Sequence, residues 1–259
     1  MSAHPQVFIV TGSSRGMGEA IALQLLQDPS HQVLGIARQR SARLDDAAQR
    51  SGAGLTQWQL DLSAPLPAAQ RLRDWLRTLP QPGTVGITLI NNAALLNTPG
   101  PVADESLEAL STALRVSLEA CLLFSSALLQ SCRDGAAPLR ILNISSGLGR
   151  RAMAGSAPYC AAKAGMDHLS RAMALDEAHR AAQGQNAARI VSLAPGVIDT
   201  EMQVQLRSAS PERFPEQQRF AGLKSEHQLS SPEAAAAAVL RYLAREDFGS
   251  QVIADVREA

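Results

Sequence analysis

Residues 7–18 read VFIVTGSSRGMG, and this stretch decides the fold. Its first four residues are apolar and mostly β-branched, which predicts a strand buried on both faces. The turn that follows has glycines at positions 12, 16 and 18, and a segment of helical period begins there. Glycines let a backbone turn tightly and approach a pyrophosphate, whose charge a helix N-terminus stabilises. The spacing departs from the GxGxxG fingerprint, so an ordinary turn is the alternative interpretation.

The rest of the chain continues the alternation of short apolar runs with longer segments of helical period. The predicted strands are residues 7–11, 32–37, 55–60, 86–91, 139–145, 188–194 and 250–255. The predicted helices are residues 16–27, 65–79, 104–132, 158–183 and 232–245. Strands that alternate with helices predict an α/β fold with a doubly wound parallel sheet. Because the sequence contains no repeat and no long linker, we expect residues 1–259 to form a single domain.

One polar region, residues 203–231, shows no regular pattern and contains Pro211 and Pro215. It is either a surface excursion or a mobile substrate lid, since ligands of open α/β sheets bind beyond the carboxyl ends of the strands.

Composition narrows the possible functions. The 259 residues carry 24 basic and 24 acidic side chains; 46% are hydrophobic and only 3% aromatic. This apolar content excludes wholesale disorder, and the balanced charge argues against nucleic acid or a membrane surface as a partner. The three cysteines lack CxxC spacing, and the five histidines lack metal-ligand spacing, so we expect no metal and a reducing compartment. Residues 1–6 do not resemble a signal peptide, and we expect a soluble cytoplasmic protein.

Two arginines indicate which cofactor the glycine turn would take. Arg15 lies inside the turn, and Arg38 follows the second predicted strand. A protein that binds NAD usually has an acid at that second position, whereas an arginine accommodates the 2′-phosphate of NADP. The sequence therefore favours NADP(H), with two solvated surface arginines as the alternative.

A tyrosine and a lysine lie four residues apart at the start of a long predicted helix. This spacing places Tyr159 and Lys163 on one face, where a cation would favour the phenolate and lower the pKa of the phenol from about 10. Ser145 and Ser146 end the preceding strand, where a hydroxyl could polarise a substrate carbonyl. An unremarkable helix face and two capping serines are the alternative interpretation.

Taken together, these motifs resemble the short-chain dehydrogenase/reductase family. The matching segments, in family order, are residues 11–18 (TGSSRGMG), 61–62 (DL), 91–93 (NNA), 143–146 (NISS), 159–163 (YCAAK) and 195–200 (PGVIDT). Within the family, residues 194–207 and 213–220 look like the bacterial benzil reductases that form (S)-benzoin, which in turn resemble sepiapterin reductases. The resemblance implies a Rossmann-type fold.

The resemblance also assigns roles to individual residues. It makes Tyr159 the acid that protonates the developing alkoxide, Ser146 the residue that orients the carbonyl, and Lys163 the residue that binds the nicotinamide ribose and lowers the pKa of Tyr159. Ser146 is preferred to Ser145 because it lies thirteen residues before Tyr159, the family's usual interval. The implied cofactor contacts are Gly12, Ser14, Arg15, Met17 and Arg38 at the adenosine phosphate end, Asp61 at the adenine, Asn92 at the adjoining ribose, and Ile198 and Thr200 at the nicotinamide carboxamide. Tyr159 and Lys163 belong to the implied cofactor contacts as well.

Two positions depart from the family pattern. Ala94 stands where the family usually has glycine, and Ser117 aligns with a catalytic asparagine that helps to hold a water in the proton relay. The resemblance further implies a homodimer or homotetramer formed through the helices at residues 104–132 and 158–183.

The leading hypothesis is therefore an NADPH-dependent carbonyl reductase that acts on a ketone or a benzil-like α-diketone. A sepiapterin-type pteridine reductase is the alternative enzyme. A nucleotide-binding regulatory protein without turnover is the alternative from another class, motivated by Ala94 and Ser117.

Overall fold

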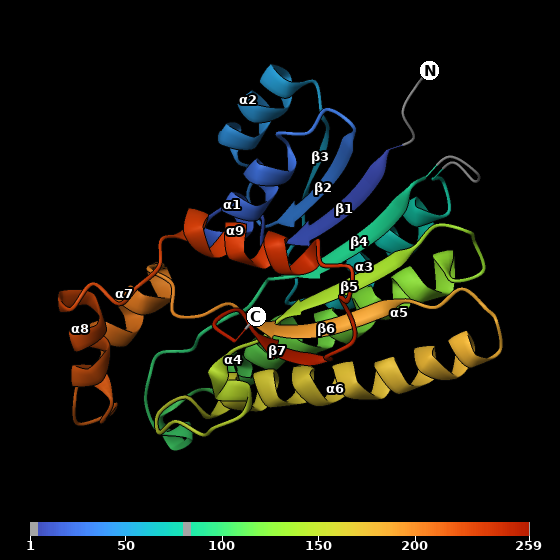
Figure 1. Cartoon of the computed structure of the whole chain (residues 1–259). Coiled ribbons are helices and arrows are strands. Elements are labelled where there is room, and N and C mark those ends of the chain that lie inside the picture. The colour runs from blue at the N-terminus through green and yellow to red at the C-terminus, as the bar shows by residue number, and fades with distance from the viewer. Residues whose placement is uncertain (1–4, 80–83, 259) are drawn as a thin grey trace.

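The apolar run that follows Pro5 forms an inner strand of a seven-stranded parallel sheet in the computed structural model, which describes residues 5–79 and 84–258 (Figure 1). The strands are β1 (Gln6–Thr11), β2 (His31–Ala37), β3 (Gly54–Gln59), β4 (Gly86–Asn91), β5 (Leu139–Ile144), β6 (Arg189–Ala194) and β7 (Ile253–Asp255). Their order is β3-β2-β1-β4-β5-β6-β7. The chain reverses its direction of winding between β1 and β4, which is where open α/β sheets bind ligands. The predicted doubly wound α/β fold is confirmed.

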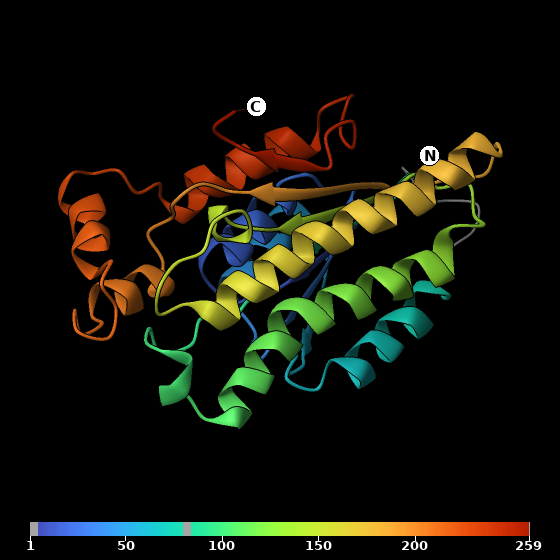
Figure 2. The ribbon, with the colours of Figure 1, turned by 90° about the horizontal axis from the view of Figure 1, so that it is seen from below.

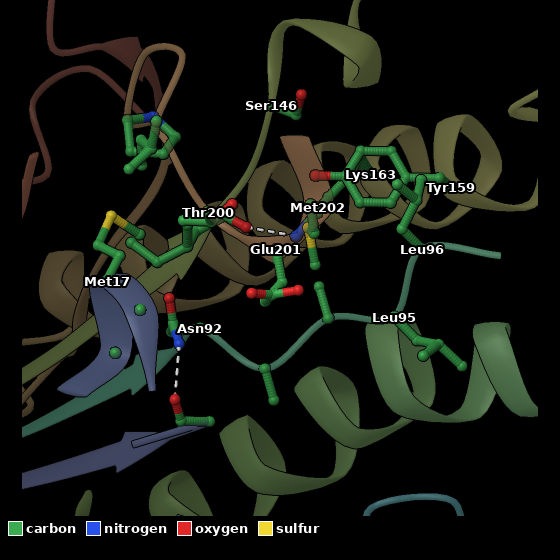
Figure 3. Close-up of a pocket in the computed structure, with 18 of the residues that line it drawn as sticks. Met17, Asn92, Leu95, Leu96, Ser146, Tyr159, Lys163, Thr200, Glu201 and Met202 are labelled. Carbon is green, nitrogen blue, oxygen red and sulfur yellow. Dashed lines mark hydrogen bonds between the residues drawn. The ribbon is translucent and has the colours of Figure 1, made fainter. Parts of the chain in front are cut away.

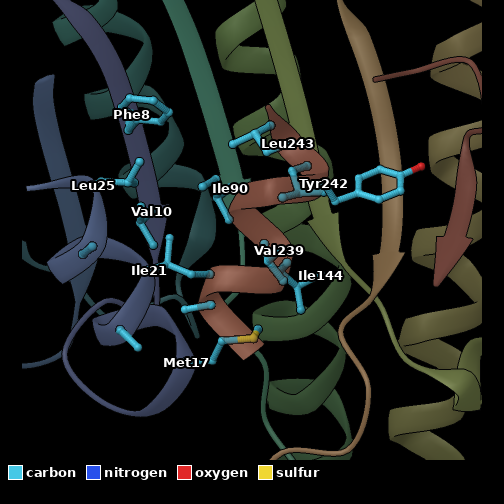
Figure 4. Close-up of a cluster of buried hydrophobic side chains, with 14 of the residues drawn as sticks. Phe8, Val10, Met17, Ile21, Leu25, Ile90, Ile144, Val239, Tyr242 and Leu243 are labelled. Atoms are coloured by element: carbon cyan, nitrogen blue, oxygen red, sulfur yellow. The ribbon is translucent and has the colours of Figure 1, made fainter. Parts of the chain in front are cut away.

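Helices cover both faces of the sheet because the strand side chains alternate between two hydrophobic cores. Phe8 and Val10 of β1 point to one face, where α1 (Gly16–Leu25) packs against α9 (Pro232–Leu243) (Figure 4). Val7 and Ile9 point to the other face. That second face is covered by α3 (Pro65–Leu76), α5 (Ala120–Cys132) and α6 (Ala157–Ala182) (Figure 2). The resulting three layers leave the carboxyl ends of the strands open at one edge.

The helix predicted over residues 104–132 has an internal irregularity. A short 3₁₀ turn (Val102–Asp104) precedes α4 (Leu107–Leu114), a π-helical turn (Arg115–Glu119) follows, and α5 completes the segment. Leu107–Cys132 is long and apolar enough to cross a membrane. However, Phe124 and Leu128 are fully buried against the sheet, so this is a core helix.

The structure corrects the sequence-based prediction at two places. Helix α2 (Ala42–Ser51) was not predicted, because only Leu44 among its residues is buried and its apolar pattern is correspondingly weak. The region at residues 203–231 is not irregular: it contains most of α7 (Glu201–Arg207) and all of α8 (Gln217–Ser225). Pro211 and Pro215 lie between these two helices rather than within them. Both helices project beyond the strand ends (Figure 1).

Candidate active site

The turn after β1 is built around glycines whose backbone angles or close contacts disfavour a larger residue. Gly12 and Gly16 have φ angles of +68° and +57°, a region that side chains disfavour. A Cβ on Gly18 would lie 2.2 Å from the Gly12 carbonyl oxygen and 2.4 Å from Nδ2 of Asn92. The amino end of α1 therefore stands directly beside the turn, with its first backbone N–H groups available to an anion.

Hydrogen bonds join the ends of β1 and β4 beneath this turn. Oγ1 of Thr11 accepts hydrogen bonds from the backbone N–H groups of Asn92 and Ala93, each at 3.0 Å. In return, Nδ2 of Asn92 donates to the Thr11 carbonyl at 2.9 Å. It also lies 3.4 Å from the Gly12 carbonyl, to which it donates a longer hydrogen bond (Figure 3). The side chain of Asn92 thus holds the glycine turn in shape.

A single pocket of about 1040 Å³ opens at the carboxyl ends of the strands. Its lining includes every site residue proposed from the sequence: Gly12, Ser14, Arg15, Met17, Arg38, Asp61, Asn92, Ser146, Tyr159, Lys163, Ile198 and Thr200. These residues come from segments up to 188 positions apart, so the fold has brought the motifs together.

The pocket also has an apolar part that the sequence analysis did not identify by residue. This part is lined by Leu95, Leu96, Leu148, Met153, Met202, Leu206 and Phe220. Leu96, Met153, Leu206, Phe214 and Phe220 form a separate hydrophobic cluster that joins α7 and α8 to the pocket. No motif marks these residues, because they meet only after the region at residues 203–231 folds over the pocket.

Tyr159 and Lys163 lie one turn apart at the start of α6, next to Ser146 after β5 (Figure 3). Nζ of Lys163, whose residue is 1% exposed, donates to the Ile144 carbonyl at 2.6 Å and lies 5.7 Å from the centre of the Tyr159 ring. Oγ of Ser146 accepts from the Leu148 N–H at 3.2 Å, so it caps a short 3₁₀ turn (Gly147–Gly149) as well as facing the pocket. Ser145 is different: its hydroxyl donates to Asp167 in the interior.

Burial has the largest effect on the pKa of Tyr159. Desolvation raises the pKa of Tyr159 to about 12, with a smaller contribution from Cys160 in the same direction and an opposing one from the Ser146 hydroxyl. The net shift is upward, so burial outweighs any lowering by Lys163, whose ammonium donates to the Ile144 carbonyl. Burial lowers the pKa of Lys163 itself to about 8, a fall that Cys121 and Asp167 oppose. The phenol therefore keeps its proton at neutral pH.

The arginines near the glycine turn differ in their partners. Arg40 pairs with Asp45 at 2.8 Å and Arg43 with Glu19 at 2.7 Å. Arg15 and Arg38 are exposed at the pocket, and within residues 5–79 and 84–258 neither makes an ion pair. Among the described residues, both guanidinium groups are thus free of ion pairs at the end of the pocket next to the glycine turn.

The remaining predicted positions lie on loops that follow the strands. Asp61 is exposed after β3, with Oδ1 accepting the Ser63 N–H at 2.9 Å. Ile198 forms an isolated parallel bridge with Ser230, and Thr200 directly precedes α7. Its methyl group lies 3.7 Å from where a Cβ on Gly16 would stand, so this loop faces the glycine turn.

Ser117, at the position of the family's asparagine, is placed differently. It is buried in the π-helical turn, and its Oγ accepts the Leu95 N–H at 3.0 Å. Its neighbour Val116 lines the pocket, whereas Ser117 supports the loop after β4 from behind.

Comparison with known proteins identifies the class that this fold and site define. The sequence model for short chain dehydrogenases matches residues 6–211. The chain belongs to this family and is an oxidoreductase of a type that uses a nicotinamide cofactor and acts on small molecules.

Individual relatives narrow the resemblance. A benzil reductase ((S)-benzoin forming) of Bacillus cereus is 32% identical over 240 residues, which cover 93% of this chain and 94% of that protein. Sepiapterin reductase of Mus musculus is 32% identical over 259 aligned positions, covering 94% of each chain. Among solved structures, a short-chain dehydrogenase/reductase from Burkholderia vietnamiensis is 34% identical, with a TM-score of 0.66 and 98% of both chains covered. The resemblance stated from the motifs is confirmed.

Proposed function

We propose that this protein is an NADPH-dependent carbonyl reductase that converts a ketone or a benzil-like α-diketone into an alcohol. The observation that carries this proposal is the convergence of Ser146, Tyr159 and Lys163 with the glycine turn in one pocket. The relatives named for benzil reduction support the substrate class, as does the apolar part of the pocket, which suits aromatic rings.

The residues around the glycine turn fit a dinucleotide phosphate cofactor. Gly12 and Gly18 let the turn pack closely on Asn92, and Arg15 and Arg38 line the pocket without an ion pair among the described residues, so they can bind a 2′-phosphate. When bound, the nicotinamide supplies the hydride. Lys163, at the base of the pocket, is the residue that would hold its ribose.

The proton is supplied by the protein. A phenol with a pKa of about 12 is protonated at neutral pH, which is the form that a proton donor requires. Tyr159 would transfer this proton to the carbonyl oxygen as negative charge develops there, while the Ser146 hydroxyl donates a hydrogen bond to the same oxygen. The ammonium of Lys163 would then favour the tyrosinate that remains.

Three further features complete the proposal. We infer that the segment at residues 203–231 acts as a lid, because Leu206 and Phe220 from it line the pocket. We also infer a homodimer or homotetramer, since Leu107, Leu122 and Leu175 are exposed on neighbouring helices. The three cysteines are free, which suits a reducing cytoplasm.

The test is the oxidation of NADPH in the presence of benzil, other diketones and simple ketones, with wild type compared with Tyr159→Phe. Loss of the proton donor should lower kcat about 10²–10⁴-fold, while the Kd for NADPH, measured by fluorescence titration, stays near its wild-type value. An unchanged kcat would contradict the role of Tyr159. Sepiapterin belongs in the same panel, because sepiapterin reductases are also relatives. NADPH binding without oxidation by any carbonyl compound would favour the regulatory alternative.

A further inference from the structure

Asp167 is a buried carboxylate below the pocket to which the mechanism above gives no role. It is 2% exposed and lies four residues after Lys163, so both side chains share one face of α6. Its Oδ1 accepts two hydrogen bonds at 2.6 Å each, from Oγ of Ser145 and Oγ of Ser192. The carboxylate therefore ties the end of β5 to β6 directly behind Ser146.

The other oxygen of this carboxylate connects to the last strand. Oδ2 of Asp167 lies 3.5 Å from Nε of Arg150. Arg150 in turn donates to the Ala254 carbonyl at 2.9 Å and lies 3.9 Å from Oδ2 of Asp255 in β7. A Cβ on Gly149 would stand 2.8 Å from Asp167 Oδ2, so the turn that follows Ser146 packs directly on the carboxylate. Two hydroxyl donors and a guanidinium are partners suited to a charged carboxylate.

Asp167 also differs in charge from the other groups that surround Lys163. Tyr159 on the same helix and Cys121 on α5 both have a pKa raised to about 12, mainly by burial, and are neutral near pH 8. Arg150 is positive and faces Asp167 rather than Lys163. Among these groups, only Asp167 offers the Lys163 ammonium a lasting negative charge, which partly offsets the cost of burying it.

We propose that Asp167 is a positioning residue of the reductase: it holds Ser145, and with it the backbone that carries Ser146, and it places a carboxylate on the helix face that carries Lys163. This inference rests on the proposed function for the roles of Ser146 and Lys163. If so, the proposed active site depends on three residues of α6: the tyrosine, the lysine and an acid one turn further along the helix.

The charge effect can be measured without turnover, because the chain contains only two lysines, Lys163 and Lys224. NMR of full-length protein labelled at lysine Nζ gives two signals, which the variant Lys224→Arg assigns. In wild type, Lys163 should titrate near pH 8. In Asp167→Asn, which keeps the shape and loses the charge, it should titrate roughly one pH unit lower.

Two matched variants control for indirect effects. Cys121→Ser alters the other group that opposes the fall of the Lys163 pKa, and Asp176→Asn removes an exposed charge from the same helix. Asp176→Asn should leave the titration of Lys163 in place, whereas Cys121→Ser should lower it separately, because that thiol also opposes the fall. An unmoved titration in folded Asp167→Asn overturns the proposal. If that chain does not fold, the double variant Asp167→Asn/Arg150→Gln removes the guanidinium left without its partner, and the same downward shift is expected.

Kinetics separate the two parts of the role. The ammonium is lost as pH rises through the pKa of Lys163, so a lower pKa in Asp167→Asn should move the alkaline limb of kcat/KM for benzil to lower pH. Ser145→Ala removes the hydrogen bond and keeps the charge; it should lower kcat and leave that limb in place. If the alkaline limb of kcat/KM lies at the same pH in Asp167→Asn and in wild type, the proposal is overturned. A shifted lysine titration in a protein that reduces no carbonyl would instead support the coupling of Asp167 to Lys163 and refute the proposed function.

Discussion

Four arginines lie near the glycine turn, and they differ in whether their guanidinium groups are already paired with a carboxylate. Arg40 and Arg43 are committed to Asp45 and Glu19, whereas Arg15 and Arg38 line the pocket without an ion pair within the described part of the chain. A guanidinium with free donors gains most from a phosphate, because the gain is not offset by a broken ion pair. The choice between NADPH and NADH should therefore depend on these two side chains.

We expect Arg38→Asp to reverse that choice. Loss of a charge-assisted contact, together with repulsion of the 2′-phosphate by the new carboxylate, should weaken NADPH binding about ten- to hundredfold, while NADH binding stays the same or improves. Fluorescence titration of both cofactors measures the two Kd values. Arg40 is a nearby arginine that does not line the pocket, so Arg40→Asp should leave the Kd values for NADPH and NADH unchanged. Equal weakening of NADPH and NADH in Arg38→Asp would show that the arginine does not read the phosphate.

Residue identities could be predicted from the sequence to the extent that they sit in short motifs. Tyr159, Lys163 and Ser146 were found in this way, because helix spacing and the end of a strand place them before any tertiary contact is known. The raised pKa of Tyr159 was not foreseen, since desolvation depends on the segments that close around the phenol. Asp167 was not foreseen either: its partners Ser145, Ser192 and Arg150 lie on three other segments.

Among the elements, α7 and α8 depend most on a few surface contacts. Nζ of Lys224 on α8 donates to Oδ2 of Asp199, which precedes α7, and Nη1 of Arg207 lies 3.6 Å from Oδ1 of the same carboxylate. The hydrogen bond from Lys224 lowers the pKa of Asp199 below its ordinary value, with Arg207 adding to the effect. Asp199 therefore keeps its charge at neutral and mildly acid pH, and these contacts weaken only as pH falls through that lowered pKa.

We expect Lys224→Gln to loosen both helices. An exposed ion pair contributes only modestly to stability, so amide hydrogen exchange in α7 and α8 should quicken up to about fivefold. KM for benzil should rise by a similar factor with little change in kcat, because Leu206 and Phe220 would close less firmly over the pocket. Lys224→Arg retains the charge and should behave as wild type. Unchanged exchange in Lys224→Gln would show that the hydrophobic cluster alone holds the two helices.

The elements themselves were predictable where burial gives them a strong pattern. β1 and α6 were found within one residue at each end, since β1 is an unbroken apolar run and α6 has clear boundaries. The polar helix α2 was missed although Ser41 precedes it and Gly52, with φ of +79°, follows it. Such terminal residues are weaker evidence than a buried stripe, because caps also occur in turns.

On the scale of the whole molecule, three neighbouring helices each expose a leucine. Leu107 on α4, Leu122 on α5 and Leu175 on α6 are 79%, 44% and 73% exposed, on helices that lie side by side (Figure 2). Exposed apolar side chains gathered on neighbouring helices are typical of protein interfaces, and a stable interface needs about 800 Å² from each partner. A second copy of the chain packed on this face would also support α6, which carries Tyr159 and Lys163 in its first two turns.

We therefore expect the protein to sediment as a dimer or a tetramer, and Leu122→Arg combined with Leu175→Arg to shift it toward the monomer at micromolar concentration. Burying two arginines without anionic partners would raise the free energy of association by more than the contacts of an ordinary interface lower it. Because α6 would lose its support, kcat should fall as the protein dissociates, and the specific activity of wild type should fall on dilution. Leu66→Arg, at a leucine that is 53% exposed at the start of α3, should leave the mass unchanged. Sedimentation velocity distinguishes these outcomes; a wild-type monomer at all concentrations, or an unaltered mass in the double variant, would exclude this face as the interface.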